Sequence, residues 1–201
     1  MGVAKIGEWR RAAQLLNRAA NGMERSIDRA LRVEAEVLRA EIVSGLTDQA
    51  PGGEPIRPLA ATTLAARRLD GFEGDKALLR RADLRNAISV TVRGLSAFVG
   101  VPRKTVHGKS LADIAKMNEF GFGPIVIVVT EAMRRFLFAL FRELGEGAGG
   151  GAEGTGGGDG VVIIHIPPRP FLRPAFDKWR KGVRERFLRR LGSDLFGAPL
   201  R

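Results

Sequence analysis

The segment that most constrains the fold is residues 163–176, with the sequence Ile-Ile-His-Ile-Pro-Pro-Arg-Pro-Phe-Leu-Arg-Pro-Ala-Phe. Its β-branched beginning is typical of a strand. Pro167 and Pro168 must end that strand, because proline fixes φ and lacks the N–H that a strand ladder needs. Pro174 fits the first turn of a helix, where the missing N–H costs nothing. The sequence therefore predicts a strand, a proline-locked elbow and a helix in direct succession.

We define the elbow as residues 167–173 and treat it as a candidate subunit interface or angle-setting joint. Its members are Pro167, Pro168, Arg169, Pro170, Phe171, Leu172 and Arg173. The prolines restrict the backbone angles, and none of these residues is of the type that commonly acts as a general acid or base. The elbow is therefore expected to act through geometry.

The helix predicted after the elbow, from Phe171 to Leu191, is strongly basic. Residues 169–190 contain nine Lys or Arg and two acids, whereas the first fifty residues contain eight and seven, in a chain of net charge +11. Its apolar face comprises Leu172, Phe176, Trp179, Val183, Phe187 and Leu191. Its candidate basic contact face comprises Lys178, Arg180, Lys181, Arg184 and Arg189. Such a stripe suits nucleic acid, an acidic protein surface or a membrane, and equally a solvated helix face.

The rest of the pattern predicts an α+β fold with a long N-terminal helix, a small, mostly antiparallel sheet and the basic C-terminal helix. A stripe of apolar and small residues predicts one helix from Val3 to Leu46. Period-two alternation predicts a hairpin from Ala87 to Val101, with its turn at Gly94. Helices are further expected at 59–69, 111–118 and 131–144, and strands at 125–130 and 161–166. The helix at 131–144 has a Phe- and Leu-rich sector, which predicts burial or an interface.

We interpret residues 1–46 as an N-terminal helical arm and residues 47–144 as an α+β core. Residues 145–160 contain ten glycines and are expected to form a flexible loop. Residues 161–191 then return to the same core as its final strand, elbow and basic helix. Residues 192–201 are expected to be a tail.

We find no catalytic, cofactor or metal motif in the sequence. Gly108-Lys109-Ser110 resembles the end of a phosphate-binding loop, but Arg103 stands where that loop requires its first glycine. Residues 149–154 fit a dinucleotide motif by letter, but they follow a helix within a glycine tract. His107 and His165 have no partner at metal-ligand spacing, and the chain has no cysteine. We therefore expect no enzyme activity, no cofactor and no metal.

The sequence also lacks the pattern of a membrane or secreted protein. No apolar run reaches the roughly 18–20 residues that a membrane span requires. The N-terminus carries early charges and no apolar segment of signal-peptide type. We expect a soluble protein made in the cytoplasm, without a membrane partner.

Four segments, in this order, resemble the virion morphogenesis and tail-completion proteins of tailed bacteriophages. Residues 58–68 resemble a proline-leucine, threonine-leucine, arginine-arginine pattern. Residues 77–88 resemble a leucine, threonine-glycine-x-leucine, serine-isoleucine pattern, with Arg81-Ala82 replacing threonine-glycine and Ala87 replacing serine. Asn118-Glu119-Phe120-Gly121 resembles a His-Glu-Phe-Gly turn, with asparagine in the histidine position. Residues 166–175 match the family pattern most fully.

This resemblance implies a non-enzymatic virion component made in the bacterial host cytoplasm. Such proteins form a homo-oligomeric ring at the neck or the upper end of the tail, and DNA passes through the ring. The implied partners are copies of the same chain, the phage head-connector protein, and a tail-tube or terminator protein. The glycine tract departs from the family pattern, and no family role is transferred to it.

An alternative hypothesis depends only on charge. The basic helix predicts a sequence-nonspecific DNA-binding protein whose affinity weakens steeply with salt. The two hypotheses are compatible, because a ring that conducts DNA needs only loose DNA contacts.

Overall fold

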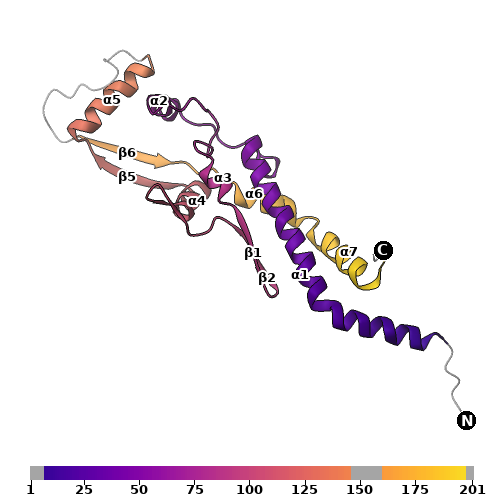
Figure 1. Ribbon diagram of the computed structural model, residues 1–201. Coiled ribbons are helices and arrows are strands. Elements are labelled where there is room, and N and C mark those ends of the chain that lie inside the picture. Colours follow the sequence, from indigo (N-terminus) through magenta and orange to yellow (C-terminus); the bar gives the residue numbers. More distant parts are fainter. Residues whose placement is uncertain (1–6, 146–159, 198–201) are drawn as a thin grey trace, which may run out of the picture.

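The computed structural model describes residues 7–145 and 160–197, and Figure 1 shows its elements along an elongated molecule. The helices are α1 (Trp9–Asp48), a 3-10 turn η1 (Pro51–Gly53), α2 (Ala61–Leu69), α3 (Asp83–Asn86), α4 (Leu111–Phe120), α5 (Glu131–Glu143), α6 (Leu172–Arg180) and α7 (Val183–Phe196). The strands are β1 (Ser89–Arg93), β2 (Ser96–Gly100), β3 (Thr105–Val106), β4 (Lys109–Ser110), β5 (Phe122–Val128) and β6 (Val161–Ile166). The expected α+β class and long N-terminal helix are confirmed.

The two halves of α1 have different surroundings. α1 packs against β1, β2, α6 and α7, and most of its buried residues lie between Ser26 and Leu46. Nearer its N-terminus the same stripe is exposed, and Trp9 and Leu16 keep 62% and 67% of their surface accessible. The helix continues through Gly22 without interruption. Apolar periodicity therefore predicted the helix, but only its C-terminal part reaches the core.

The hydrophobic core lies where α1, the β1–β2 hairpin, α4 and α6 meet. Its residues come from segments far apart in the sequence, which ties the first helix to the last third of the chain. The buried members are Leu38, Ile42, Leu46, Ile56, Ala77, Leu84, Ile88, Val101, Leu111, Ala115, Phe171 and Ala175.

The basic C-terminal segment forms two helices, so the prediction of one helix from Phe171 to Leu191 is wrong. α6 ends at Arg180 and α7 begins at Val183. Nη2 of Arg186 donates to the Trp179 carbonyl at 3.2 Å, which satisfies one of the carbonyl groups that a helix end leaves open. The break allows both helices to pack along α1.

The tail predicted from residue 192 also begins too early. α7 continues to Phe196, and Gly197 follows it in the left-handed conformation with φ of 72°. Leu195, which follows Leu191 by four residues on α7, is buried and lies beside Gly22 of α1. The apolar face of the C-terminal helix thus extends one turn beyond Leu191, where the sequence analysis placed its end.

Within the described residues, the strands form three separate two-stranded antiparallel sheets. β1 and β2 pair from Ser89↔Gly100 to Arg93↔Ser96, which confirms the predicted hairpin. The short β3–β4 hairpin was not predicted. His107 and Gly108 at its turn both have positive φ, as a type I′ turn requires. This turn explains the local sequence Gly108-Lys109-Ser110 without a phosphate-binding loop.

β5 and β6 form a ribbon that projects from the rest of the fold (Figure 1). Its register runs from Ile125↔Ile164 to Val128↔Val161, with a shift between Phe122 and Ile125. The strand predicted at 125–130 therefore begins and ends earlier than expected, whereas the strand at 161–166 is confirmed.

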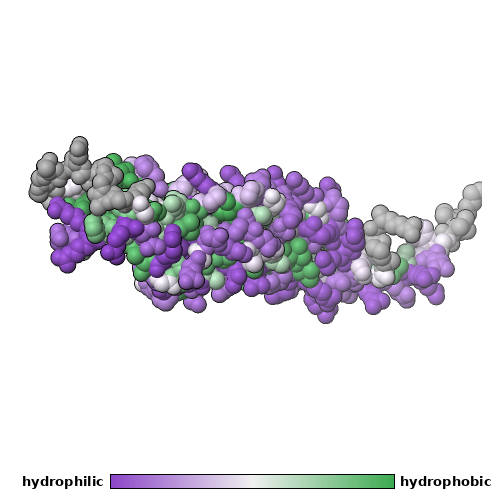
Figure 2. Space-filling view, turned by 90° about the horizontal axis from the view of Figure 1, so that it is seen from above, coloured by the Kyte–Doolittle hydropathy of each residue, from purple (hydrophilic) through white to green (hydrophobic). Residues whose placement is uncertain are grey.

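Helix α5 lies in the chain between β5 and β6 and packs against α2, where Arg68 and Glu143 form an ion pair at 3.3 Å. Of its apolar sector only Leu140 is buried, while Phe136 and Phe141 are exposed, as is Phe138 outside that sector. Figure 2 shows such apolar groups as separate areas on an otherwise polar surface. A buried helix is therefore ruled out, and the interface role remains a prediction.

Candidate functional site

The elbow is held by a single carboxylate that lies 52 residues earlier in the chain. Glu119 accepts hydrogen bonds from the backbone N–H groups of Phe171, Leu172 and Arg173, at 2.8, 3.0 and 2.8 Å. These are N–H groups at the beginning of α6, which have no partner within the helix. Glu119 therefore serves as the N-terminal cap of α6, and its negative charge lies at the positive end of the helix dipole.

Glu119 is positioned by α4 and by the turn that ends it. Oγ of Ser110 accepts from the Asp113 N–H at 3.3 Å and begins the helix. Gly121 ends it with φ of 77°. A Cβ at Gly121 would lie 3.0 Å from the Ile166 carbonyl oxygen and 3.2 Å from the Pro168 nitrogen. Only glycine therefore permits this close approach between the turn and the elbow.

Arg169 fastens the elbow to the segment before α2. Its backbone N–H donates to the Asn118 carbonyl at 2.6 Å. Its side chain donates from Nε to the Arg57 carbonyl at 3.0 Å and from Nη2 to the Pro58 carbonyl at 3.1 Å. Burial of the guanidinium, together with the nearby charge of Arg57, lowers the pKa of Arg169 from its ordinary value.

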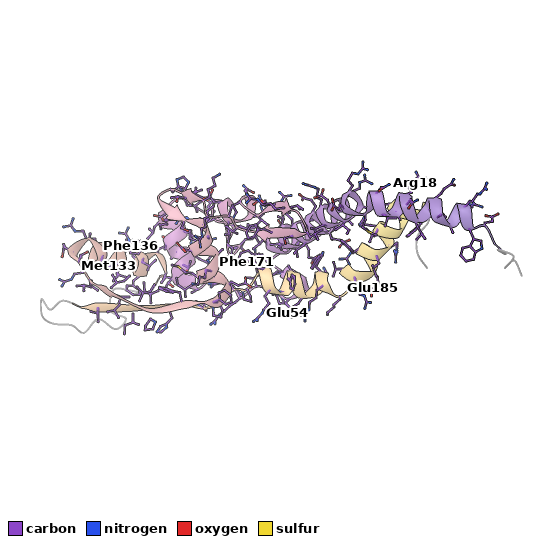
Figure 3. The ribbon with its side chains drawn as sticks, turned by 90° about the horizontal axis from the view of Figure 1, so that it is seen from below. Arg18, Glu54, Met133, Phe136, Phe171 and Glu185 are labelled. Carbon is purple, nitrogen blue, oxygen red and sulfur yellow. The ribbon has the colours of Figure 1, made fainter. Side chains whose placement is uncertain are left out.

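The elbow also enters the hydrophobic core. Phe171 is completely buried, and Figure 3 shows it near the middle of the molecule. The η1 turn packs directly on α6, since a Cβ at Gly52 would clash with the Pro174 carbonyl group. We call this set of contacts, from Pro58, Glu119 and Gly121 to the elbow, the elbow junction.

The predicted elbow residues thus differ in their surroundings. Arg169 and Phe171 are buried, Pro167 and Leu172 are partly buried, and Pro168, Pro170 and Arg173 are exposed. Sequence reasoning missed Glu119 as the central polar group. One signal was available: an acid in the last turn of a helix opposes the dipole of that helix, so Glu119 needed a partner elsewhere.

The predicted basic face is only partly free. Lys178 pairs with Glu41 of α1 at 2.6 Å, and Arg180 pairs with Asp177 at 3.2 Å. Lys181, Arg184 and Arg189 are exposed and form no ion pair with any described residue. Part of the C-terminal charge therefore serves to hold α6 on α1, which lowers the charge available to a partner.

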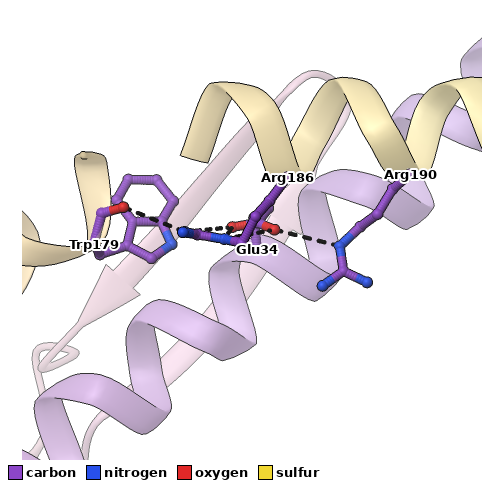
Figure 4. Close-up of polar contacts among 4 residues, drawn as sticks. All are labelled: Glu34, Trp179, Arg186 and Arg190. Atoms are coloured by element: carbon purple, nitrogen blue, oxygen red, sulfur yellow. Dashed lines mark hydrogen bonds and ion pairs between the residues drawn. The ribbon is translucent and has the colours of Figure 1, made fainter. Parts of the chain in front are cut away.

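Two further arginines of α7 pair with a carboxylate of α1 and were not part of the predicted face. Arg186 and Arg190 pair with Glu34 at 3.0 and 3.3 Å, and Glu34 is only 2% exposed (Figure 4). Nη2 of Arg186 also reaches the Trp179 carbonyl, so one side chain links α1, α6 and α7. A buried carboxylate needs such partners, because desolvation without them is costly.

The histidines and the nucleotide-like segments of the sequence belong to no catalytic or metal-binding arrangement in the part of the chain that the structure describes. His107 and His165 line one groove beside the elbow. No group of three or more potential metal ligands occurs among the residues for which coordinates are described. The dinucleotide-like letters at 149–154 lie outside the described residues. No helix in the described part of the chain is long and apolar enough to cross a membrane.

No protein-family model, curated protein or solved structure matches this chain.

Proposed function

We propose that the chain is a non-enzymatic structural protein of a tailed-phage virion. In this proposal it is a tail-completion or neck ring subunit that joins the head connector to the tail, with DNA passing through the ring. It is made in the host cytoplasm and functions in the virion. The phage assignment depends on the four resembling segments, and the assembly depends on the exposed surface of the molecule.

The four segments support the proposal because they contribute to one structural unit. In the elbow junction, Arg169 of the fourth segment donates to the Pro58 carbonyl of the first, and the Phe171 N–H of the fourth donates to Glu119 of the third. The second segment supplies Leu84 and Ile88 to the core beside it. Because the four resembling segments meet around the elbow junction, we expect them to serve one structural role in the subunit.

The observation that carries the proposal is a pair of exposed apolar patches at opposite ends of the molecule. The ribbon patch is Val126, Val128, Val161 and Ile163, which form cross-strand pairs on one face of β5–β6. Val126 and Ile163 are 61% and 58% exposed. The helix patch is Trp9, Leu16 and Met23, which recur every seventh residue along α1 and are also exposed. Figure 1 places the ribbon and the beginning of α1 at the two ends.

Patches of this kind favour association with other chains. An apolar ribbon face with free edges is a surface that proteins normally cover or protect. Two different patches at two ends allow head-to-tail contact between copies, which closes into a ring when the rotation between copies permits. A symmetric dimer would require one patch that matches itself.

The test is the mass of the assembled protein. Native mass spectrometry and electron microscopy of the purified chain, alone and with connector and tail-tube proteins of the same virus, are expected to show a closed ring. The variant Val126→Lys with Ile163→Glu replaces an apolar cross-strand pair by an opposite-charge pair and should prevent ring formation. The control variant Arg93→Lys with Ser96→Glu places the same charges on the β1–β2 hairpin and should leave ring formation intact.

A chain that stays monomeric with every partner, or a ribbon variant that assembles normally, would contradict the proposal. Absence of the protein from purified particles would contradict the virion assignment separately.

A second candidate function is sequence-nonspecific DNA binding through Lys181, Arg184 and Arg189. These side chains are exposed and form no ion pair with any described residue, so they are available to phosphates. Replacing all three by glutamine should weaken duplex binding at low salt and reduce its salt dependence. The matched control replaces Arg93, Arg103 and Lys104, which are exposed elsewhere, by glutamine. Equal affinity of the two triple variants would eliminate this function.

A further inference from the structure

A groove of about 1070 Å³ lies beside the elbow, and its wall is strongly cationic. It is bordered by the segment before α2, the segment before α3, the β3–β4 turn, α4 and the end of β6. Six lining side chains are cationic, namely Arg57, Arg67, Arg80, Arg81, Lys109 and Arg169. Asp83 is the one carboxylate among its described lining residues. Neither the ring proposal nor the basic face makes use of this groove.

Two of the arginines are recessed and fixed in place. Arg67 and Arg169 are each 8% exposed. Nη1 of Arg67 donates to the Gly74 and Lys76 carbonyls, both at 2.9 Å. Arg169 is fastened in the same way to the Arg57 and Pro58 carbonyls. Carbonyl partners orient a guanidinium, and they leave its positive charge without a counter-ion.

The positive charge of the two side chains is not neutralised within the described structure. Neither Arg67 nor Arg169 has a carboxylate at ion-pair distance among the described residues. Burial, followed by the charges of Arg80 and Arg169, lowers the pKa of Arg67 from its ordinary value, and Asp75 is the nearby charge that opposes this effect. Nη2 of Arg67 and Nη1 of Arg169 donate to no described residue. The groove therefore holds donors and charge that an anion would satisfy.

Of two further lining arginines, Arg81 forms no ion pair with a described residue and adds positive charge, whereas the charge of Arg80 is paired. Arg80 is held by Asp70 at 2.6 Å and lies over the Phe72 ring at 4.4 Å from its centroid. Arg81 lies 5.3 Å from the same centroid. Both side chains are exposed, whereas Arg67 and Arg169 are buried in the wall of the groove.

The shape of the groove distinguishes between anions. A DNA duplex presents its phosphates on a wide convex surface, which fits poorly over two arginines that are each only 8% exposed. Leu59, Leu78 and Ile114 add apolar wall to the groove. A narrow segment with a carboxylate next to an apolar side chain fits both features, because a carboxylate matches the fork of an arginine.

We propose that this groove binds an acidic, partly apolar peptide segment of a partner protein, with Arg67 and Arg169 holding its carboxylates. This binding does not depend on ring formation, and it can be measured whether or not the ring proposal holds.

The test uses fluorescence anisotropy with a fluorescein-labelled peptide built of Asp, Glu and Leu, and full-length protein whose mass is checked in parallel. The comparison probes are the same peptide with Asn and Gln in place of the acids, inorganic phosphate as competitor, and labelled single-stranded and duplex DNA. Arg67→Gln is expected to lower the affinity for the acidic peptide about ten-fold, the loss typical of one charge-assisted contact. Lys181, Arg184 and Arg189 replaced together by glutamine should leave it unchanged.

Circular dichroism and thermal unfolding check that Arg67→Gln still folds. If Arg67→Gln does not fold, the double variant Arg81→Gln with Lys109→Gln, at two exposed lining residues, takes its place. This variant should lower the affinity for the acidic peptide about three-fold or more. The proposal is overturned if the acidic peptide binds no better than its amide version. The proposal is also overturned if the triple variant of Lys181, Arg184 and Arg189 loses as much affinity for the acidic peptide as Arg67→Gln does. Tighter binding of phosphate or DNA than of the acidic peptide at the same groove would overturn it as well.

Discussion

The elbow junction and the β5–β6 ribbon adjoin each other in the chain, yet only the junction has its polar and apolar groups satisfied by other described residues. At the elbow junction, three N–H groups meet one carboxylate, a buried arginine meets two carbonyls, and Phe171 is fully enclosed. In the ribbon, both strands carry consecutive β-branched residues, so both faces are apolar and one of them remains exposed. The difference indicates that the junction holds the subunit together, whereas the exposed ribbon face is the surface that our proposal assigns to contact with another chain.

The comparison also explains the place of the ribbon in the fold. A two-stranded ribbon is marginally stable by itself, and it gains stability by packing on a further element. Here the ribbon enters the elbow directly at Ile166 and Pro167, so the junction anchors its base. Its far end has α5 beside it on the α2 side (Figure 1), and the side chains of the ribbon patch are exposed.

The largest effect is expected from removing the carboxylate of the elbow junction. Glu119→Ala leaves three N–H groups at the start of α6 without their acceptor and should lower the free energy of unfolding by about 3–4 kcal/mol. Glu119→Gln keeps one acceptor oxygen and should cost about half as much. Urea unfolding monitored by circular dichroism measures both. Glu54→Ala, at an exposed carboxylate, is the control and should stay within about 0.5 kcal/mol.

A smaller loss is expected when the close approach at Gly121 is blocked. Gly121→Ala forces a side chain into a backbone region that essentially only glycine adopts, next to the Ile166 carbonyl and Pro168. The free energy of unfolding should fall by about 2–3 kcal/mol in the same assay. Gly74→Ala is the control, since a Cβ there meets nothing within 4 Å. An unchanged Gly121→Ala protein would show that the turn and the elbow are not tightly packed.

The smallest effect on stability is expected in the ribbon. Val126→Lys with Ile163→Glu changes exposed residues and keeps a favourable cross-strand pair, so monomer unfolding should change by less than about 1 kcal/mol. The measurement is made at a protein concentration where the variant and the parent are both monomeric. A loss as large as that of Glu119→Ala would mean that the ribbon patch is part of the subunit core, and the contrast between the two regions would fail.

Local patterns predicted much of the fold. The α1 helix, the β1–β2 hairpin, β6 and the strand–elbow–helix order follow from spacing and from proline, because these preferences act over a few residues. The break between α6 and α7 was missed, since a helical pattern with one glycine is compatible with either a continuous or an interrupted helix. The end of α7 was missed because the apolar position at Leu195 was assigned to a tail.

The candidate site was only half predictable. The elbow residues were identified from their prolines, but the sequence does not show that Arg169 is buried or that Glu119 caps α6. The basic face was defined by helical position alone, and Glu41 and Glu34 of α1 engage several nearby cations. Which charges are free depends on which helices lie against each other.

By itself, the sequence determined where strands end, where helices begin and which segments are basic. Proline geometry, residue periodicity and charge are properties of short stretches and need no partner segment. Only the tertiary structure decided that Glu119 meets the start of α6, 52 residues on, and that Arg169 meets carbonyls 112 and 111 residues away. Those contacts arise from packing between distant segments, and packing also decides which half of α1 is covered and which apolar faces stay exposed.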